Sequence, residues 1–196
     1  MAQTRQAEAG PFGRWRARAA AKRQRLEAAH QLYVAAVGLA RDPVLYARWG
    51  VPDTNDGRLE MIQLHAGLVM RRLGRGGEDA RALGQELFDV MFADIDRNLR
   101  ELGVGDLSVG KKVKAIAASF FGRLAGLEAA VAAGDAAALG EVLRRNVFPA
   151  GSVPAADQVE ALARHLLALD RRLAGVDEAE LLAGRLGASG APGVAD

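Results

Sequence analysis

The sequence lacks cysteine and is poor in the residues that favour β-strands. Without a thiol, the chain has no disulfide scaffold, thiolate zinc site, iron–sulfur cluster or cysteine nucleophile. Threonine and isoleucine are scarce, whereas the helix-favouring alanine, leucine, arginine and glutamate dominate. No uninterrupted apolar run approaches the roughly eighteen residues that a membrane-spanning helix needs. We therefore expect an all-α protein with no sheet, and one that does not span a bilayer.

Length and patterning predict one domain. Half of the 196 residues are hydrophobic, and a chain of this size buries roughly 70% of its unfolded surface. Apolar periodicity and capping residues predict a single compact domain of six to eight helices with a protruding N-terminal helix. The predicted helices cover 15–40, 43–50, 58–73, 78–102 and 110–133, one begins after Asp135, one covers 157–173, and a short one begins at Asp177. A glycine-rich turn is expected over 103–110, a flexible leader over 1–14, the helical domain over 15–186 and a disordered tail over 187–196.

Positive charge is concentrated at the beginning of the chain. The net charge is only +2, yet seven basic residues stand there beside two acids: Arg5, Arg14, Arg16, Arg18, Lys22, Arg23 and Arg25, with Glu8 and Glu27. Such a start is typical of a transit peptide, an arm for anionic lipid or RNA, or a solvated leader. We favour the solvated leader, because Gly10, Pro11 and Gly13 interrupt a helix early.

Two central helices carry features beyond their hydrophobicity. Asp94 falls inside the apolar arc of the helix over 78–102, which predicts an ion pair with an arginine or lysine of a neighbouring helix. The next helix has small residues on one face, at Ala115, Ser119, Gly122 and Gly126. This face suits close approach by a helix of the same fold or, alternatively, of a partner. Three of the four lysines, Lys111, Lys112 and Lys114, stand in its first turns, where cations oppose the helix dipole.

The sequence contains no recognised catalytic motif. Phosphate-binding loops, dinucleotide-binding glycine patterns, nucleophile elbows and paired zinc-ligand motifs are all missing. His30, His65 and His165 fall in separate predicted helices. Glu27 and His30 have the spacing used in di-iron bundles, but a second copy is missing. The position of His65 between Met61 and Leu68 indicates a hydrogen-bonded core histidine.

Several motifs in one order resemble the ubiquinol:cytochrome c reductase assembly chaperone family. The resemblance is carried by Gly50-Val51-Pro52-Asp53-Thr54, Gly57-Arg58, Glu60-Met61, Leu64-His65, Arg71-Arg72-Leu73, Leu87-Phe88-Asp89, Met91-Phe92, Asp94, Asp96, Leu99-Arg100, Gly103 to Leu107, Val109-Gly110-Lys111 and Phe120-Phe121-Gly122-Arg123. It covers about Leu32 to Leu127 and continues more loosely over Leu139 to Arg145. Phe121, Leu59 and Gly110 depart from the family pattern, which more often shows Tyr, an aromatic residue and Pro at these places.

The resemblance implies a non-enzymatic helical chaperone without a cofactor, which binds newly made cytochrome b and assists assembly of the reductase. A groove lined by Leu, Met and Phe and edged by Lys111, Lys112, Arg58 and Arg123 would suit such a client. The expected partner-binding residues are Pro52, Asp53, Thr54, Arg58, His65, Asp94, Lys111, Lys112, Phe120, Phe121 and Arg123. The alanine- and arginine-rich composition with few lysines indicates a bacterial gene. For such a chain the resemblance implies a peripheral place at the cytoplasmic face of the inner membrane, and for a eukaryotic one the mitochondrial matrix.

Other functions stay open at this point. One alternative is a haem- or metal-handling protein with His65 or His30 as ligand. Another is contact of the basic N-terminus with RNA near the ribosome exit region or with the membrane surface; binding to DNA is not expected. An enzyme with an unfamiliar set of catalytic residues is the least favoured.

Overall fold

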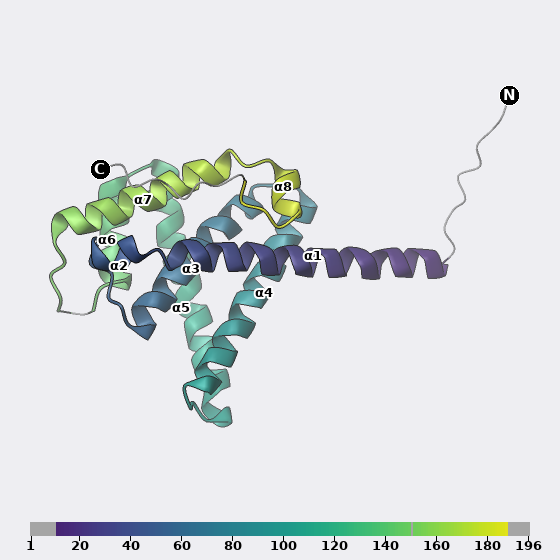
Figure 1. Ribbon diagram of the computed structural model, residues 1–196, viewed down its shortest axis with the longest axis horizontal. Coiled ribbons are helices and arrows are strands. Elements are labelled where there is room, and N and C mark those ends of the chain that lie inside the picture. Colours follow the sequence, from purple (N-terminus) through teal and green to yellow (C-terminus); the bar gives the residue numbers. More distant parts are fainter. Residues whose placement is uncertain (1–10, 150, 188–196) are drawn as a thin grey trace.

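A computed structural model describes residues 11–149 and 151–187, and the regular structure within them is entirely α-helical. The helices are α1 (Pro11–Ala40), α2 (Pro43–Ala47), α3 (Asn55–Gly74), α4 (Glu78–Glu101), α5 (Asp106–Ala133), α6 (Ala136–Asn146), α7 (Ala156–Ala174) and α8 (Glu178–Leu182). Figure 1 shows α1 projecting well beyond the other helices. The described part of the chain thus confirms an all-α domain of six to eight helices with a protruding first helix.

Helix α3 forms the centre of the domain. Every residue from Gln63 to Val69 is buried, because α1, α4, α5 and α7 all pack against this helix. A helix that is buried on all sides needs small and apolar residues around its whole circumference. Gly67 meets this requirement, since a Cβ added there would lie 3.2 Å from the Leu124 side chain of α5.

The two halves of α1 have different surroundings. From Ala28 onwards α1 contributes buried residues to the core and packs against α3 and α4. The first half projects into solvent, where Phe12 and Trp15 are 83% and 68% exposed. The helix begins at Pro11, four residues before the predicted start at Trp15. Proline is favourable in the first turn because its missing N–H has no partner to lose there.

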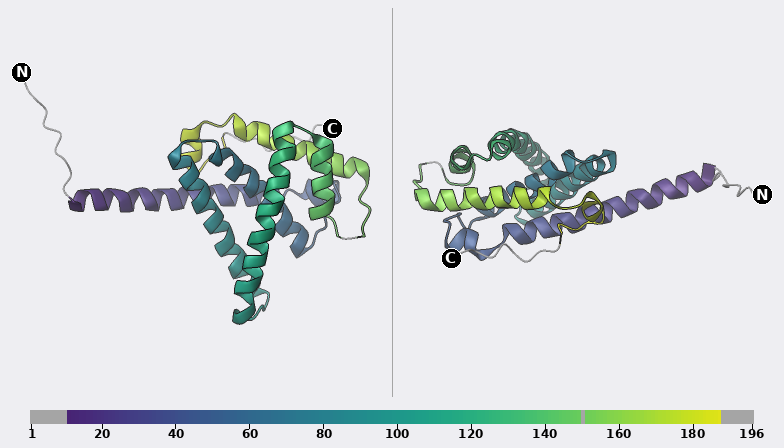
Figure 2. Two further views of the ribbon diagram at one scale, coloured as in Figure 1. Left: turned by 180° about the vertical axis from the view of Figure 1, so that it is seen from behind. Right: turned by 90° about the horizontal axis from the view of Figure 1, so that it is seen from above.

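Of the remaining helices, α7 packs on α3 directly, while α6 and α8 pack on the helices around it. Helix α7 packs against α3 and α6, while α8 contacts α1 and α4. Figure 2 shows in both views that the first half of α1 extends away from the other helices. The leader over 1–10 and the tail over 188–196 lie outside the described residues.

Capping residues set several helix ends as predicted. The Asp42 carboxylate accepts a hydrogen bond from the Val44 N–H, at 3.0 Å, at the start of α2. Gly134 ends α5 in the left-handed conformation, with φ of +65°, and the Asp135 carboxylate caps α6. These ends depend on local geometry, which explains why their residues identify them.

Helices α4 and α5 form a hairpin whose tip points away from the body (Figure 1). The predicted glycine-rich turn over 103–110 is too long, because α5 already begins at Asp106. A glycine inside a helix costs only about 1 kcal/mol, so Gly110 does not break it. Lys111 and Lys112 therefore follow the first turn of α5. The helix dipole acts mainly within that turn, so the predicted unfavourable position of these lysines is wrong.

Candidate protein-binding surface

The loop between α2 and α3 holds three of the predicted partner-binding residues, and a fourth, Arg58, lies in the first turn of α3. The Thr54 hydroxyl caps α3 by accepting a hydrogen bond from the Gly57 N–H, at 3.1 Å. Gly57 lies so close to Pro52 that an added Cβ would be 2.1 Å from its carbonyl oxygen. Asp53 and Arg58 form an exposed ion pair at 2.6 Å, and the hydrogen bond from Arg58 lowers the pKa of Asp53. Pro52 and Thr54 therefore shape the start of α3, and the ion pair beside them faces solvent.

His65 lies in the interior, as its apolar neighbours predict. Its side chain is fully buried, and Nδ1 lies 2.8 Å from the Met61 carbonyl oxygen. Because a carbonyl only accepts, Nδ1 carries the proton of the neutral ring. Burial lowers the pKa of His65 to about 4, which keeps the ring neutral at pH 7. The prediction of a hydrogen-bonded core histidine is confirmed.

His65 lies next to a second ring, which in turn contacts a third. The centroid of the His165 ring of α7 lies 5.7 Å from that of His65, and the Trp49 ring lies 5.1 Å from His165. This group of tilted rings is not visible in the sequence, because its members are far apart in the chain. Residues 11–149 and 151–187 contain no group of three histidine or carboxylate side chains placed to hold a metal ion. His30 is exposed on α1, away from these rings.

Asp94 joins α4 to α1 without a cationic partner among the described residues. Its carboxylate accepts hydrogen bonds from the Tyr33 hydroxyl, at 2.8 Å, and from the Asn98 side-chain amide, at 3.1 Å. Burial, with the hydrogen bond to Asp94 second, raises the pKa of Tyr33. The predicted ion pair is thus wrong: a half-buried carboxylate is stabilised here by neutral donors, which avoid the cost of burying a second charge.

Four phenylalanines join α4 to α5. Phe88 and Phe92 of α4 are 4.5 Å apart, and Phe88 stacks on Phe121 of α5 at 5.3 Å between ring centroids. Phe120 packs at 6.0 Å from both rings of α4. Phe120 is buried, whereas Phe121 is 57% exposed. The cluster therefore holds the hairpin together and presents one aromatic ring at the surface.

Arg123 holds α5 against α3. Its guanidinium lies 3.2 Å from the Glu60 carboxylate and donates a hydrogen bond to the side-chain amide oxygen Oε1 of Gln63 at 2.7 Å. Burial raises the pKa of Glu60, and the charge of Arg123 opposes that rise. Arg123 is thus largely occupied within the domain, whereas Lys111 and Lys112 are exposed on the hairpin.

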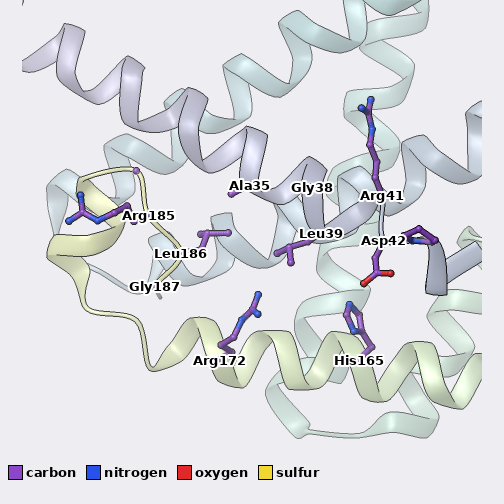
Figure 3. A pocket seen from close by; sticks show the side chains of 12 residues that line it. Ala35, Gly38, Leu39, Arg41, Asp42, His165, Arg172, Arg185, Leu186 and Gly187 are labelled. Carbon is purple, nitrogen blue, oxygen red and sulfur yellow. The ribbon is translucent and has the colours of Figure 1, made fainter. Parts of the chain in front are cut away.

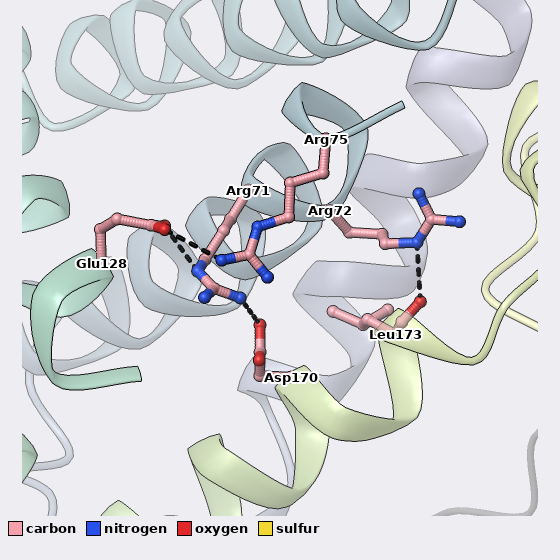
Figure 4. Close-up of polar contacts among 6 residues, drawn as sticks. All are labelled: Arg71, Arg72, Arg75, Glu128, Asp170 and Leu173. Atoms are coloured by element: carbon pink, nitrogen blue, oxygen red, sulfur yellow. Dashed lines mark hydrogen bonds and ion pairs between the residues drawn. The ribbon is translucent and has the colours of Figure 1, made fainter. Parts of the chain in front are cut away.

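A second arginine anchors α5 and α7 to the central helix. Figure 4 shows Arg71 of α3 between Glu128 of α5 and Asp170 of α7. Its Nε lies 2.5 Å from a Glu128 oxygen, and its Nη1 pairs with Asp170. The Arg71 side chain is 4% exposed, Asp170 14% and Glu128 45%. This triad fixes the position of the second half of α5.

The apolar character of α5 is unusual for so exposed a helix. Residues Ser108–Ala133 reach a mean hydropathy of 1.4 in the best 18-residue window, long and apolar enough to cross a membrane by composition alone. The segment is not an uninterrupted apolar run, since Arg123 and Glu128 interrupt it, but its alanine, leucine and phenylalanine residues raise the average between these charges. Core helices of soluble proteins pass the same test when they are mostly buried, but only 22% of this window is buried.

The exposed face of α5 consists of small residues. Only Gly126 of the predicted small face meets another helix, since an added Cβ would lie 3.6 Å from Val142 of α6. The others face solvent together with neighbouring alanines: Ala115, Ala118, Ser119, Gly122 and Ala125. Beside them, a hollow of about 360 Å³ is lined by Met70, Leu124 and Phe121 among others. We call this region, Lys111 to Ala125 with the hollow, the α5 surface.

The fold and the α5 surface define a class: an all-helical scaffold whose distinguishing feature is an exposed, apolar face of small residues on α5. A family model described as ubiquinol-cytochrome C chaperone matches residues 47–188. The chain belongs to this family of non-enzymatic assembly factors. The match extends through α6, α7 and α8, beyond the region where the motifs resemble the family most closely.

A solved structure agrees with this assignment. The crystal structure of the Cbp3 homolog from Brucella abortus is 35% identical in sequence and superposes with a TM-score of 0.76. The similarity covers 87% of this chain and 91% of that one. A search of curated proteins finds no match. The chain is accordingly an assembly chaperone of ubiquinol–cytochrome c reductase.

Proposed function

We propose that this chain binds newly synthesised cytochrome b and holds it on the α5 surface while the reductase assembles. Family membership supports the role in reductase assembly. The observation that carries the choice of surface is the combination of high hydropathy and low burial in α5. Exposed apolar surface of this extent is costly in a monomer and is typical of sites that bind another protein.

The chemistry of the α5 surface fits an apolar helix of the client. Ala115, Ala118 and Gly122 leave room for a second helix backbone to approach closely, as small residues do between membrane helices. The exposed Phe121 ring offers an anchor that is already held by Phe88. Lys111 and Lys112 at one end complement an acidic loop next to such a helix.

A substitution on the α5 surface tests this proposal. Ala118→Arg places a long cation on an exposed position, so the fold is retained but close helix approach is blocked. Ala168→Arg, on an exposed position of α7, is the matched control. In a strain that lacks the chain, Ala118→Arg should fail to recover cytochrome b by co-purification and should leave the reductase unassembled, whereas the control restores both.

The outcomes distinguish an error in the proposed binding surface from an error in the proposed function. If Ala118→Arg restores assembly fully, the client does not use this face of α5. If deletion of the gene leaves cytochrome b and reductase at normal levels, the proposed function itself is refuted.

The protruding half of α1 supports a peripheral position at the cytoplasmic face of the inner membrane. It exposes Trp15 beside Arg16, Arg18 and Lys22, and cations next to an aromatic ring suit an anionic lipid surface. Binding to vesicles with phosphatidylglycerol should weaken with salt. It should also weaken when these three cations are replaced by glutamine. Equal binding by both proteins would exclude this contact, and selective binding to ribosomes would assign the same helix to the exit region.

A further inference from the structure

A cavity of about 700 Å³ lies between α1, α7 and the segment that follows α8. Figure 3 shows Leu39 of α1 above it, Leu186 on one side, and Arg172 and His165 of α7 below. The wall formed by α1 is apolar, with Ala35 and Gly38 beside Leu39. The cavity lies away from the α5 surface and takes no part in the function proposed above.

Arg172 faces this cavity with its charge unpaired. All three nitrogens of its guanidinium are buried, and none has a hydrogen-bond partner among residues 11–149 and 151–187. The other interior arginine, Arg71, has two carboxylates. A guanidinium offers five N–H donors, and a buried cation without an acceptor is strongly unfavourable. The arrangement is therefore incomplete unless an acceptor enters the cavity.

The charged side chains near Arg172 do not supply that acceptor, because the one carboxylate is engaged elsewhere and the other two are cations that point away. Asp42 is engaged as the cap of α2, and its carboxylate points toward His165 (Figure 3). Arg185 points away from the cavity and pairs with Glu180 at 2.7 Å, and Arg41 also points away. The His165 Nε2 is buried too and has no hydrogen-bond partner among the described residues, and the His165 side chain lines the same cavity.

We propose that this cavity binds a carboxylate group carried on an apolar body, with Arg172 as its cationic partner. A carboxylate matches the two parallel N–H bonds of one guanidinium. A phosphate dianion would need further cations or a cluster of backbone N–H groups. Of the three arginines labelled in Figure 3, only Arg172 points into the cavity, which is too little positive charge for a phosphate. The ligand is expected to carry an apolar body because the wall that α1 contributes to the cavity is apolar. Free amphipathic acids and acidic side chains on an apolar protein segment both provide this chemistry.

Titration of the full-length protein with decanoate tests the proposal, with calorimetry as the readout. Decanoate should bind at one saturable site. Arg172→Met keeps the apolar stem and removes the charge, so decanoate affinity should fall by at least about tenfold. Arg171→Met removes an exposed arginine next to it and should leave the affinity unchanged. Uncharged decanol and inorganic phosphate should each bind at least about tenfold more weakly than decanoate.

Thermal unfolding without ligand gives an independent measurement. Because Arg172 has no internal partner, Arg172→Met should unfold at the same temperature as the natural protein or higher. A clear fall in its unfolding temperature would show that Arg172 is paired within the fold and would overturn the proposal. Equal decanoate binding by Arg172→Met, or equal binding of decanol, would also overturn it. Competition by a leucine-rich peptide with one glutamate would identify a protein segment as the source, and failure to compete would identify a small acid.

Discussion

Removal of Asp170 should destabilise the protein far more than removal of Glu128, although both pair with the same arginine. In Asp170→Leu, the buried guanidinium of Arg71 loses its more enclosed partner and keeps only Glu128, which is 45% exposed. Breaking a buried pair from one side costs about 3 kcal/mol or more. Since 1 kcal/mol shifts Tm by roughly 2–4 °C in a chain of this size, Tm should fall by about 6–12 °C.

Glu128→Leu provides the comparison. Its carboxylate is partly hydrated and also reaches the exposed Arg75, at 3.2 Å. A partly exposed ion pair contributes at most about 1 kcal/mol, so Tm should fall by no more than about 4 °C. The double variant Arg71→Met and Asp170→Leu removes both buried charges together. Its stability should lie closer to that of the natural protein than to that of Asp170→Leu.

Thermal unfolding of the four proteins measures these differences in Tm at pH 7, and urea unfolding measures the corresponding free energies. Equal losses for Asp170→Leu and Glu128→Leu would refute the argument that burial determines the strength of the pair. A double variant as unstable as Asp170→Leu would refute the argument that the unpaired charge, and not lost packing, causes the loss.

Two further predictions concern His65 and the start of α3. The folded-state pKa of His65, about 4, lies below the unfolded value of about 6.5, so the unfolded chain binds more protons between these values. Stability should be complete above pH 6.5 and fall by up to about 1.4 kcal/mol per unit as the pH drops toward 4, with His165 acting in the same direction. A His65 ring that titrates near pH 6.5 by NMR would contradict this. Gly57→Ala should lose about 2 kcal/mol or more in urea unfolding, because the new Cβ meets the Pro52 carbonyl at 2.1 Å. Gly110→Ala, in open space within α5, should instead gain about 0.5–1 kcal/mol, and equal effects of the two changes would show that the close approach is absent.

Local chemistry explains how much of the fold could be predicted. Asp42, Gly134 and Asp135 mark helix ends through bonds to residues within a few positions, so their effect is visible in the sequence. The start of α5 was misplaced because a glycine in a helix costs less than the packing and hydrogen bonds of the surrounding helix supply. Periodicity also identified the apolar arcs, since a helix repeats every 3.6 residues whatever it packs against.

The candidate site required information that periodicity does not contain. Asp94 was recognised as a polar residue on an apolar face, but its partner Tyr33 lies 61 positions away. The sequence pattern of α5 predicted a small-residue face and left open whether it meets a helix of the same fold. Only the positions of α3, α4 and α6 show that this face is open except at Gly126.

The sequence by itself determined the helical class, the caps, the core position of His65 and the family, because each depends on residues close together or on motifs in order. Tertiary structure alone decided which faces are covered. It buried His65 beside His165 and paired Arg71 with Asp170. It also left Arg172 of α7 without a partner among the described residues and kept α5 exposed. The physical reason is that burial depends on the packing of helices distant in the chain, whereas helix formation and capping depend on neighbours a few residues apart.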